Sequence, residues 1–195
     1  MIVDMLVEGV TDEIVARKLI RFTRHEPGAV HGKAGQGYIR ETISGYNVRA
    51  TFGNPVLALV DFADTRLDCP PQVPSTWLAE RSSRLLLRVV VRELESWLLA
   101  DRPGVARFLG ISAALVPRNP EQLPDPKQKF VNLARRSRRR RIHENIVPQE
   151  GTSSIVGPGY IAAVYEFVES FWNVQEALHY ADSLYRCVER LRELS

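Results

Sequence analysis

The stretch NPVLALVDFAD, residues 54–64, constrains the fold most strongly because it is apolar along almost its whole length. A strand with one solvated face alternates apolar and polar residues, whereas a strand covered on both faces reads as a continuous apolar run. Such strands are typical of parallel sheets that carry helices on both sides. Residues 55–61 are therefore predicted to form a buried strand of a parallel sheet.

Two further strands are predicted, over residues 2–7 and over the run RLLLRVVV, which becomes helical around Glu93. Helices are expected from a cap at Thr11 to about Arg24, over 38–46 and over 77–82, with loops at 25–37 and 68–75. This alternation of strands and helices indicates an α/β fold of three layers, a Rossmann-like parallel sheet flanked by helices.

The second half of the chain is predicted to be helical. Asp125 is expected to cap a helix that starts with Pro126, and two apolar stripes at 160–172 and 178–191 are interpreted as core packing. A chain of 195 residues suits one domain. We expect a single domain over 1–195, with an α/β core at 1–101 and a mainly helical extension at 102–195 packed on it.

Composition indicates the compartment. The only cysteines, Cys69 and Cys187, make no disulfide framework, which favours a reducing environment. No apolar stretch reaches the roughly 20 residues of a membrane span, and Asp4 interrupts the first apolar run, so no signal peptide is indicated. A cytoplasmic protein without a membrane partner is expected.

Acidic residues follow each predicted strand. Glu8 follows the first, Asp61 ends the second with Asp64 three residues later, and Glu93 and Glu95 follow the third. The carboxyl ends of neighbouring parallel strands form the ligand crevice of such sheets, so these acids are expected in one small volume. A bound cation relieves their repulsion, and oxygen ligands suit Mg²⁺ or Mn²⁺.

Each acid taken alone has a simpler interpretation, as a helix cap or a partner in a surface salt bridge. That interpretation is favoured for Asp64, Asp68 and Asp101. A functional role is favoured for Glu8 and Asp61, because the strands before them are so apolar.

Basic residues provide candidate phosphate contacts. Six arginines lie between Arg135 and Arg141, and such a cluster suits a polyanion such as nucleic acid, with a solvated helix face as an equal alternative. The predicted contacts within it are Arg138, Arg139, Arg140 and Arg141. Lys33, in a glycine-rich loop, and Lys127, in the first turn of its helix, are further phosphate-binding candidates. From the residues alone, a flexible loop and a solvated lysine are the favoured interpretations of these two.

The stretches LVEGVTDEIVARKLI, ALVDFAD and VVVRELESWLLAD resemble, in their order and spacing, the TOPRIM-like proteins. They are similar in particular to an uncharacterised bacterial family related to the TOPRIM domains of overcoming-lysogenization-defect (OLD) nucleases, and LPDPKQKF and SLYRCVERL look like later stretches of that family. The resemblance implies that Glu8 and Asp61 bind Mg²⁺ during phosphodiester cleavage or transfer, and that Glu95 extends the cluster. TOPRIM domains usually carry Asp-x-Asp, whereas Asp61 and Asp64 are three apart, so Asp64 reaches the site only if the chain turns.

Two main hypotheses follow. The first is a Mg²⁺- or Mn²⁺-dependent nuclease in which Glu8 is a ligand or general base, Asp61 and Glu95 are ligands, and the arginines hold the nucleic-acid backbone. The alternative is a non-catalytic TOPRIM-like subunit that binds nucleic acid or a partner, such as a separately encoded ATPase of a phage-defence or DNA-maintenance system. A third, weaker hypothesis is that the basic tract is only an assembly surface.

Overall fold

The computed structural model describes residues 1–194 and divides the chain into two compact units. Unit 1 comprises Met1–Val91 and Ser183–Ser195, and unit 2 comprises Arg92–Asp182. These boundaries differ from the expected ones, because the α/β core ends at Val91 rather than at residue 101 and the end of the chain returns to it. Whether the two units make one domain or two stays a prediction.

Unit 1 is built on a four-stranded sheet in which every strand is parallel to its neighbours, as the apolar run at 55–61 predicts. The strand order is β2-β1-β3-β4. Leu6 lies opposite His31 on one side and Ala58 on the other, so β1 is central. The strands are β1 (Ile2–Val7), β2 (Glu26–Gly32), β3 (Val56–Asp61) and β4 (Leu85–Val90).

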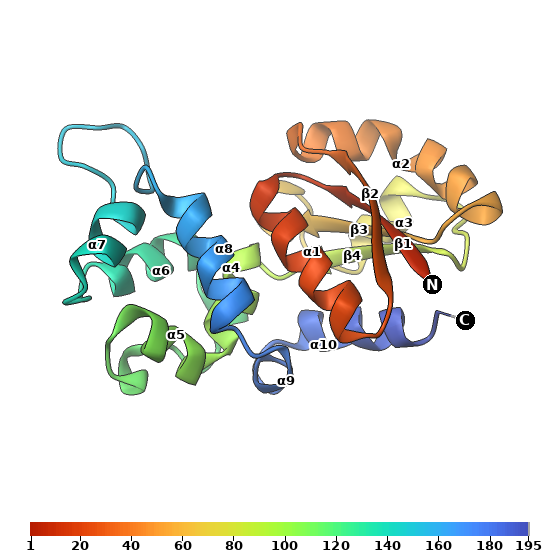
Figure 1. Cartoon of the computed structure of the whole chain (residues 1–195). Helices are drawn as coiled ribbons and strands as arrows, with labels where there is room; N and C mark the ends of the chain where they lie inside the picture. The colour runs from red at the N-terminus through yellow and green to blue at the C-terminus, as the bar shows by residue number, and fades with distance from the viewer. Residues whose placement is uncertain (195) are drawn as a thin grey trace. The chain divides into compact units, whose positions relative to one another are not determined.

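Helices cover both faces of this sheet, which confirms the predicted α/β class (Figure 1). On one face, Ile39, Ile43 and Ala50 of α2 pack on alternate residues of the strands. On the other face lie α1 and α10, and Ser183 Oγ accepts a hydrogen bond of 3.2 Å from Val91 N just beyond β4. The helices are α1 (Val10–Phe22), α2 (Gly35–Phe52), α3 (Gln72–Trp77) and α10 (Asp182–Arg192), with a 3₁₀ turn, η1 (Phe62–Asp64).

The prediction of a loop at 25–37 is wrong, because most of this segment forms β2. Proline and glycine argue against a central strand, but β2 lies at the edge of the sheet, where Pro27 is tolerated. At Gly28 a Cβ atom would lie 2.3 Å from Asp4 Oδ1, so only glycine allows this close approach of the backbone. Pairing with β1, rather than local propensity, makes this segment a strand.

Several predicted boundaries were also wrong. The α1 helix begins at Val10 with Gly9 as its N-cap rather than Thr11, and Asp12 Oδ2 accepts the Gly9 N–H at 3.0 Å. The helix expected over 77–82 lies at 72–77, with Pro71 as its N-cap. The 178–191 stripe is not wholly core, since Tyr185 is 47% exposed.

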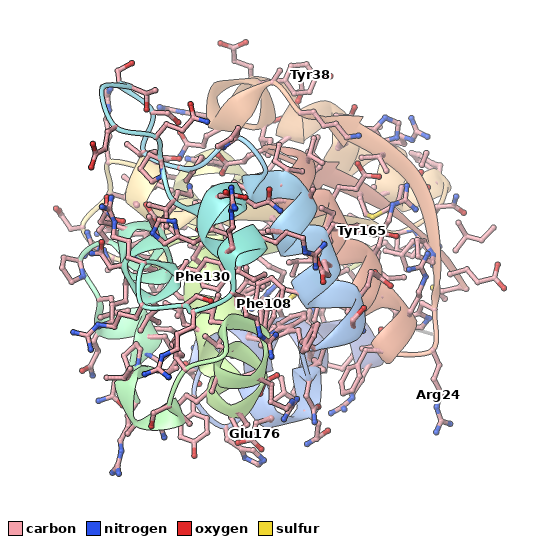
Figure 2. The ribbon with its side chains drawn as sticks, turned by 60° about the vertical axis from the view of Figure 1, so that its left-hand side comes forward. Arg24, Tyr38, Phe108, Phe130, Tyr165 and Glu176 are labelled. Carbon is pink, nitrogen blue, oxygen red and sulfur yellow. The ribbon has the colours of Figure 1, made fainter. Side chains whose placement is uncertain are left out.

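Unit 2 is helical, as predicted for the second half of the chain. Figure 2 shows Phe108 and Phe130 among its helices, and both rings pack against Phe167 with centroid distances of 5.2 and 6.1 Å. Its elements are α4 (Leu94–Ala100), α5 (Arg102–Leu109), η2 (Ala113–Leu115), η3 (Pro120–Gln122), α6 (Pro126–Ala134), α7 (Arg140–Ile146), α8 (Tyr160–Ser170) and α9 (Val174–Ala177).

Carboxylate caps set the starts of two of these helices. Asp125 Oδ1 accepts the Gln128 N–H at 2.7 Å, which confirms the predicted cap of α6. Asp101 is buried and caps α5 by accepting from Gly104 N, so the cap interpretation favoured for it is confirmed. The apolar stripe on α8 is only partly core, because Ile161 and Tyr165 are more than half exposed. Over residues 1–194, no helix combines the length and apolar character needed to cross a membrane.

One buried carboxylate ties the sheet of unit 1 together. Asp4, in β1, is 2% exposed. Its Oδ1 accepts from Ala29 N at 3.0 Å and from Asn54 Nδ2 at 3.3 Å, and its Oδ2 lies 3.2 Å from Arg49 of α2. Asp4 therefore joins β1 to the edge strand, to the turn before β3 and to α2.

Replacing this carboxylate is expected to destabilise the fold. Asp4→Ala leaves several donors without their acceptor, and hydrogen bonds to a charged group are worth about 1.5–3 kcal/mol each before neighbours relax. We predict a loss of about 3 kcal/mol in the free energy of unfolding, measured by urea denaturation. The control Asp68→Ala, at an exposed position, should change it by less than about 0.5 kcal/mol. Equal effects of the two changes would contradict the assignment.

Candidate functional site

The best-supported site lies at the carboxyl edge of the unit 1 sheet. Because all four strands run in the same direction, the segments that follow them emerge at this edge, where open α/β sheets bind ligands. Glu8 follows β1, and Asp61 is the last residue of the neighbouring strand β3. Both residues are partly buried.

Glu8 and Asp61 are in direct contact. Glu8 Oε1 accepts a hydrogen bond of 2.9 Å from the backbone N–H of Asp61, across 53 residues of sequence. A carboxylate can accept several hydrogen bonds or metal bonds at once, so this bond orients Glu8 and leaves the group chemically suited to bind a ligand. The structure thus brings together the two acids on which the sequence-based hypothesis depends most.

Asp64 lies one short turn beyond Asp61. The chain bends into the 3₁₀ turn η1 at Phe62–Asp64, so the turn required by the spacing of three residues is present. Asp64 is exposed and borders an open pocket with residues of α2.

Within residues 1–194, no group of three or more His, Cys, Asp or Glu side chains is arranged to hold a metal ion. Glu8, Asp61 and Asp64 belong to unit 1, and Glu95 to unit 2.

Lys33 is held near the same edge, but its charge is already paired. Its backbone N–H donates to Val7 O at 2.8 Å, and its Nζ lies 2.5 Å from Glu13 Oε2. Burial would raise the pKa of Glu13, but hydrogen bonds from Lys33 and Arg17 outweigh it and lower the pKa. The loop at 33–35 is also tied to the catalytic candidate, since Gly35 N donates to the Glu8 carbonyl at 3.1 Å. Lys33 thus has a structural role here, and phosphate binding by it stays a prediction.

In unit 2, three helix starts bring Glu95, Lys127 and Tyr160 together. The Glu95 side chain is 2% exposed, and its Oε1 accepts from Tyr160 Oη at 2.7 Å and lies 3.7 Å from Lys127 Nζ. Its Oε2 is shielded and has no hydrogen-bond partner within residues 1–194. Lys127, by contrast, keeps 31% of its side chain exposed. Two residues predicted for separate roles, metal binding and phosphate binding, are thus neighbours.

Glu93 completes this cluster from the N-cap of α4. Its Oε2 accepts the backbone N–H of Lys127 at 3.1 Å. Burial raises the pKa of Glu93; the hydrogen bond and charge of Lys127 partly oppose the rise, whereas Glu95 and Asp125 reinforce it. Glu93 therefore holds its proton to a higher pH than an exposed glutamate.

The arginine tract is exposed, but half of it has protein partners. It does not form one helix, because α6 ends at Ala134 and α7 begins at Arg140. Arg139 donates to Phe108 O at 2.9 Å, Arg140 pairs with Glu144 at 2.7 Å, and Arg141 binds both carboxylate oxygens of Glu166. Among the described residues, Arg135, Arg136 and Arg138 are the arginines of this tract whose side chains make neither an ion pair nor a hydrogen bond.

Sequence reasoning missed Tyr160 and the residues that line the pocket beside Asp64. Tyr160 was assigned to an apolar core stripe, and its ring is indeed buried, but its hydroxyl donates to Glu95. A buried tyrosine hydroxyl usually has a hydrogen-bond partner, so a tyrosine in an apolar stripe indicates a polar group nearby. No comparable signal marks Arg40 or Arg66, which reach the pocket from separate segments.

Removing the Tyr160 hydroxyl is expected to destabilise unit 2. Tyr160→Phe deprives a buried carboxylate of a donor at 2.7 Å, and we predict a loss of about 2 kcal/mol in unfolding free energy by urea denaturation. The matched control is Tyr165→Phe on the same helix, because Tyr165 is 56% exposed. The control should change stability by less than about 0.5 kcal/mol. A similar loss in both variants would argue against the Glu95 bond.

The raised pKa of Glu93 predicts a pH-dependent effect of Glu93→Gln. The folded state binds more protons than the unfolded chain between the ordinary value of 4.5 and the higher folded pKa, so wild-type stability falls as pH rises through this window. Glutamine keeps the acceptor for Lys127 N–H and cannot ionise. The stability of the variant minus that of wild type should therefore increase as the pH is raised from below 4.5 to neutrality. Denaturation curves recorded across that range measure this difference. A difference that does not change with pH would show the prediction to be wrong.

The sequence and fold were compared with models of known protein families, with curated proteins and with solved structures, and no match was found in any of the three.

Proposed function

We propose that this chain carries out metal-dependent hydrolysis or transfer of phosphodiester bonds in nucleic acid, with a TOPRIM-like acidic site at the carboxyl edge of the unit 1 sheet. One observation supports it above the others. The carboxylate of Glu8 meets the backbone of Asp61 at the ends of two neighbouring parallel strands, with an Oε1–N distance of 2.9 Å.

The donor set at this edge fits a hard divalent cation. Glu8 and Asp61 offer carboxylate oxygens, which Mg²⁺ and Mn²⁺ prefer. Mg²⁺ commonly binds proteins through one or two carboxylates and takes its other ligands from water and substrate phosphates, so a site need not contain a third acid. Such an ion, when bound, polarises a phosphoryl oxygen and lowers the pKa of an attacking water.

The chain's own residues would keep this edge rigid. The Asp61 amide fixes the orientation of Glu8, and the bond between Gly35 N and the Glu8 carbonyl holds the next loop beside it. Glu8 would act as ligand or general base, and Asp61 as ligand. Glu95, buried between Tyr160 and Lys127, is better suited to positioning these two side chains than to meeting a substrate.

Exposed arginines in unit 2 support a polyanionic substrate. Arg135, Arg136 and Arg138 are exposed and make no ion pair with the described residues, so their charges can neutralise backbone phosphates without reading sequence. Arg139, Arg140 and Arg141 would contribute less, because a new contact has to compete with their present partners.

The test is a charge-removing substitution that keeps the fold. Glu8→Gln retains an oxygen for the Asp61 N–H and loses the negative charge. We expect wild-type protein with Mg²⁺ or Mn²⁺ to cleave DNA or RNA, and the variant to be slower by a factor on the order of 10² or more. Wild type should also gain about 2.7 kcal/mol of stability at a hundredfold excess of metal over Kd, and the variant much less.

The matched control is Glu26→Gln, an exposed glutamate at the opposite, amino end of the same sheet. It should leave both cleavage and stabilisation by metal unchanged. Wild-type protein that gains no stability from either metal and cleaves no nucleic acid would refute the proposed function.

A second candidate is a non-catalytic subunit that binds nucleic acid or a partner protein. The spacing of three residues between Asp61 and Asp64, where TOPRIM domains usually carry Asp-x-Asp, favours it. It predicts nucleic-acid binding that persists when metal is chelated and in Glu8→Gln, without cleavage by the wild type.

A further inference from the structure

An open pocket of about 490 Å³ lies in unit 1 between the first half of α2 and the segment after β3. Its volume is within the range of small-molecule sites and suits a single nucleotide, whereas a duplex would not enter it. The polar residues that line it are Gln36, Arg40, Glu41, Asp64, Thr65 and Arg66. We call it the Arg40–Arg66 pocket.

Two guanidinium groups give this pocket its strongest binding chemistry. Arg40 and Arg66 are exposed, and neither makes an ion pair with the other residues that the structure describes. Arginine presents a planar set of donors that matches the oxygens of a phosphate, and it binds phosphates in a bidentate manner. Two such groups bordering one pocket favour a ligand with a phosphate group.

Gln36 adds a donor that lacks an acceptor. Its Nε2 atom is shielded from solvent and has no hydrogen-bond partner within residues 1–194. Buried donors are nearly always paired, and each exception calls for an explanation. Gln36 lines the pocket, so a ligand bound there would lie beside this unpaired amide group.

The backbone conformation of Arg66 is consistent with a functional role for its side chain. Its φ of 55° lies in the left-handed region, where glycine or asparagine is favoured and a long side chain carries a conformational cost. Residues held in such conformations are common at ligand sites. Arginine at this position, bordering the pocket, fits a role for its guanidinium.

The two acids of the pocket restrict the ligand further. Glu41 and Asp64 balance the charges of Arg40 and Arg66, so a purely anionic ligand would be attracted at one part and repelled at another. A nucleotide carries a phosphate together with sugar hydroxyls and base amino groups, which can donate to carboxylates. The pocket also contains Asp64, three residues beyond Asp61 of the proposed site.

We propose that the Arg40–Arg66 pocket binds a phosphorylated nucleotide at the end of a nucleic-acid strand, so that the protein selects strand ends carrying a terminal phosphate. The choice of a nucleic-acid strand rests on the proposed function. The phosphate interaction rests on the pocket itself.

The first experiment compares short single-stranded oligonucleotides of one sequence with a 5′-phosphate, a 3′-phosphate or no terminal phosphate. Binding is measured by fluorescence anisotropy with a chelator present, so that cleavage does not interfere. We expect one phosphorylated form to bind about tenfold or more tightly than the unphosphorylated form, as charge-assisted bonds to a phosphate allow. Equal affinity for all three forms would overturn the proposal.

The second experiment uses two arginines in the same unusual conformation. Arg66→Gly and Arg24→Gly both place glycine at a left-handed φ, 55° and 64°, so neither substitution should impair folding. Figure 2 shows Arg24 pointing away from the molecule, and Arg24 does not line the pocket. Arg66→Gly should lose the preference for a phosphorylated end, as should Arg40→Gln, and Arg24→Gly should keep it. A preference retained by Arg66→Gly would contradict the proposal.

Two further measurements are needed. One distinguishes a strand end from a free nucleotide as the ligand, and the other distinguishes failure of the pocket proposal from failure of the proposed function. Competition by a free nucleoside monophosphate at concentrations comparable to the oligonucleotide would identify a free nucleotide as the phosphate source and overturn the assignment to strand ends. Glu8→Gln should keep the end preference while losing cleavage. Wild-type cleavage that ignores terminal phosphates would refute the pocket alone, and an end preference without any cleavage would refute the proposed function alone.

Discussion

The parallel pairing of β1 with β3 is the constraint on which unit 1 depends. Both strands are buried on both faces, and a slip of one residue would exchange those faces, so packing fixes their register. Since the strands run in the same direction with Leu6 opposite Ala58, the residues after them emerge at one edge. The contact between Glu8 and the Asp61 amide is therefore a consequence of hydrophobic packing, although 53 residues separate the two in sequence.

The sequence predicted those parts of the fold that burial determines locally. Continuous apolar runs identified β1, β3 and β4, and Asp125 followed by Pro126 identified the start of α6. The edge strand β2 was missed because its residues, EPGAVHG, have little strand propensity of their own. Pairing with β1 and the bond from Ala29 N to Asp4 hold it, and both are tertiary interactions that no local pattern records.

The same distinction applies to the site. The proximity of Glu8 and Asp61 could be predicted because the end of a strand fixes the edge of the sheet at which a side chain lies. Arg141 could not be separated from Arg138 in the sequence, because its partner Glu166 is 25 residues away. Pairing of Arg140 with Glu144 is an ordinary contact across one helical turn and could have been anticipated. A run of like charges thus identifies exposed residues without identifying those whose charge is available to a ligand.

Burial divides the acids into two groups. Asp4, Asp101 and Glu95 are each almost fully buried and accept hydrogen bonds from donors within the protein, so their first role is in the fold. Glu8 and Asp61 are only partly buried and lie at an edge where ligands bind in related sheets. Burying a carboxylate is costly unless donors or an opposite charge compensate, and Tyr160 and Lys127 provide that compensation for Glu95. Glu95, which the sequence groups with Glu8 and Asp61, is therefore set apart from them by its burial among partners in unit 2, where it lies 3.7 Å from Lys127 Nζ.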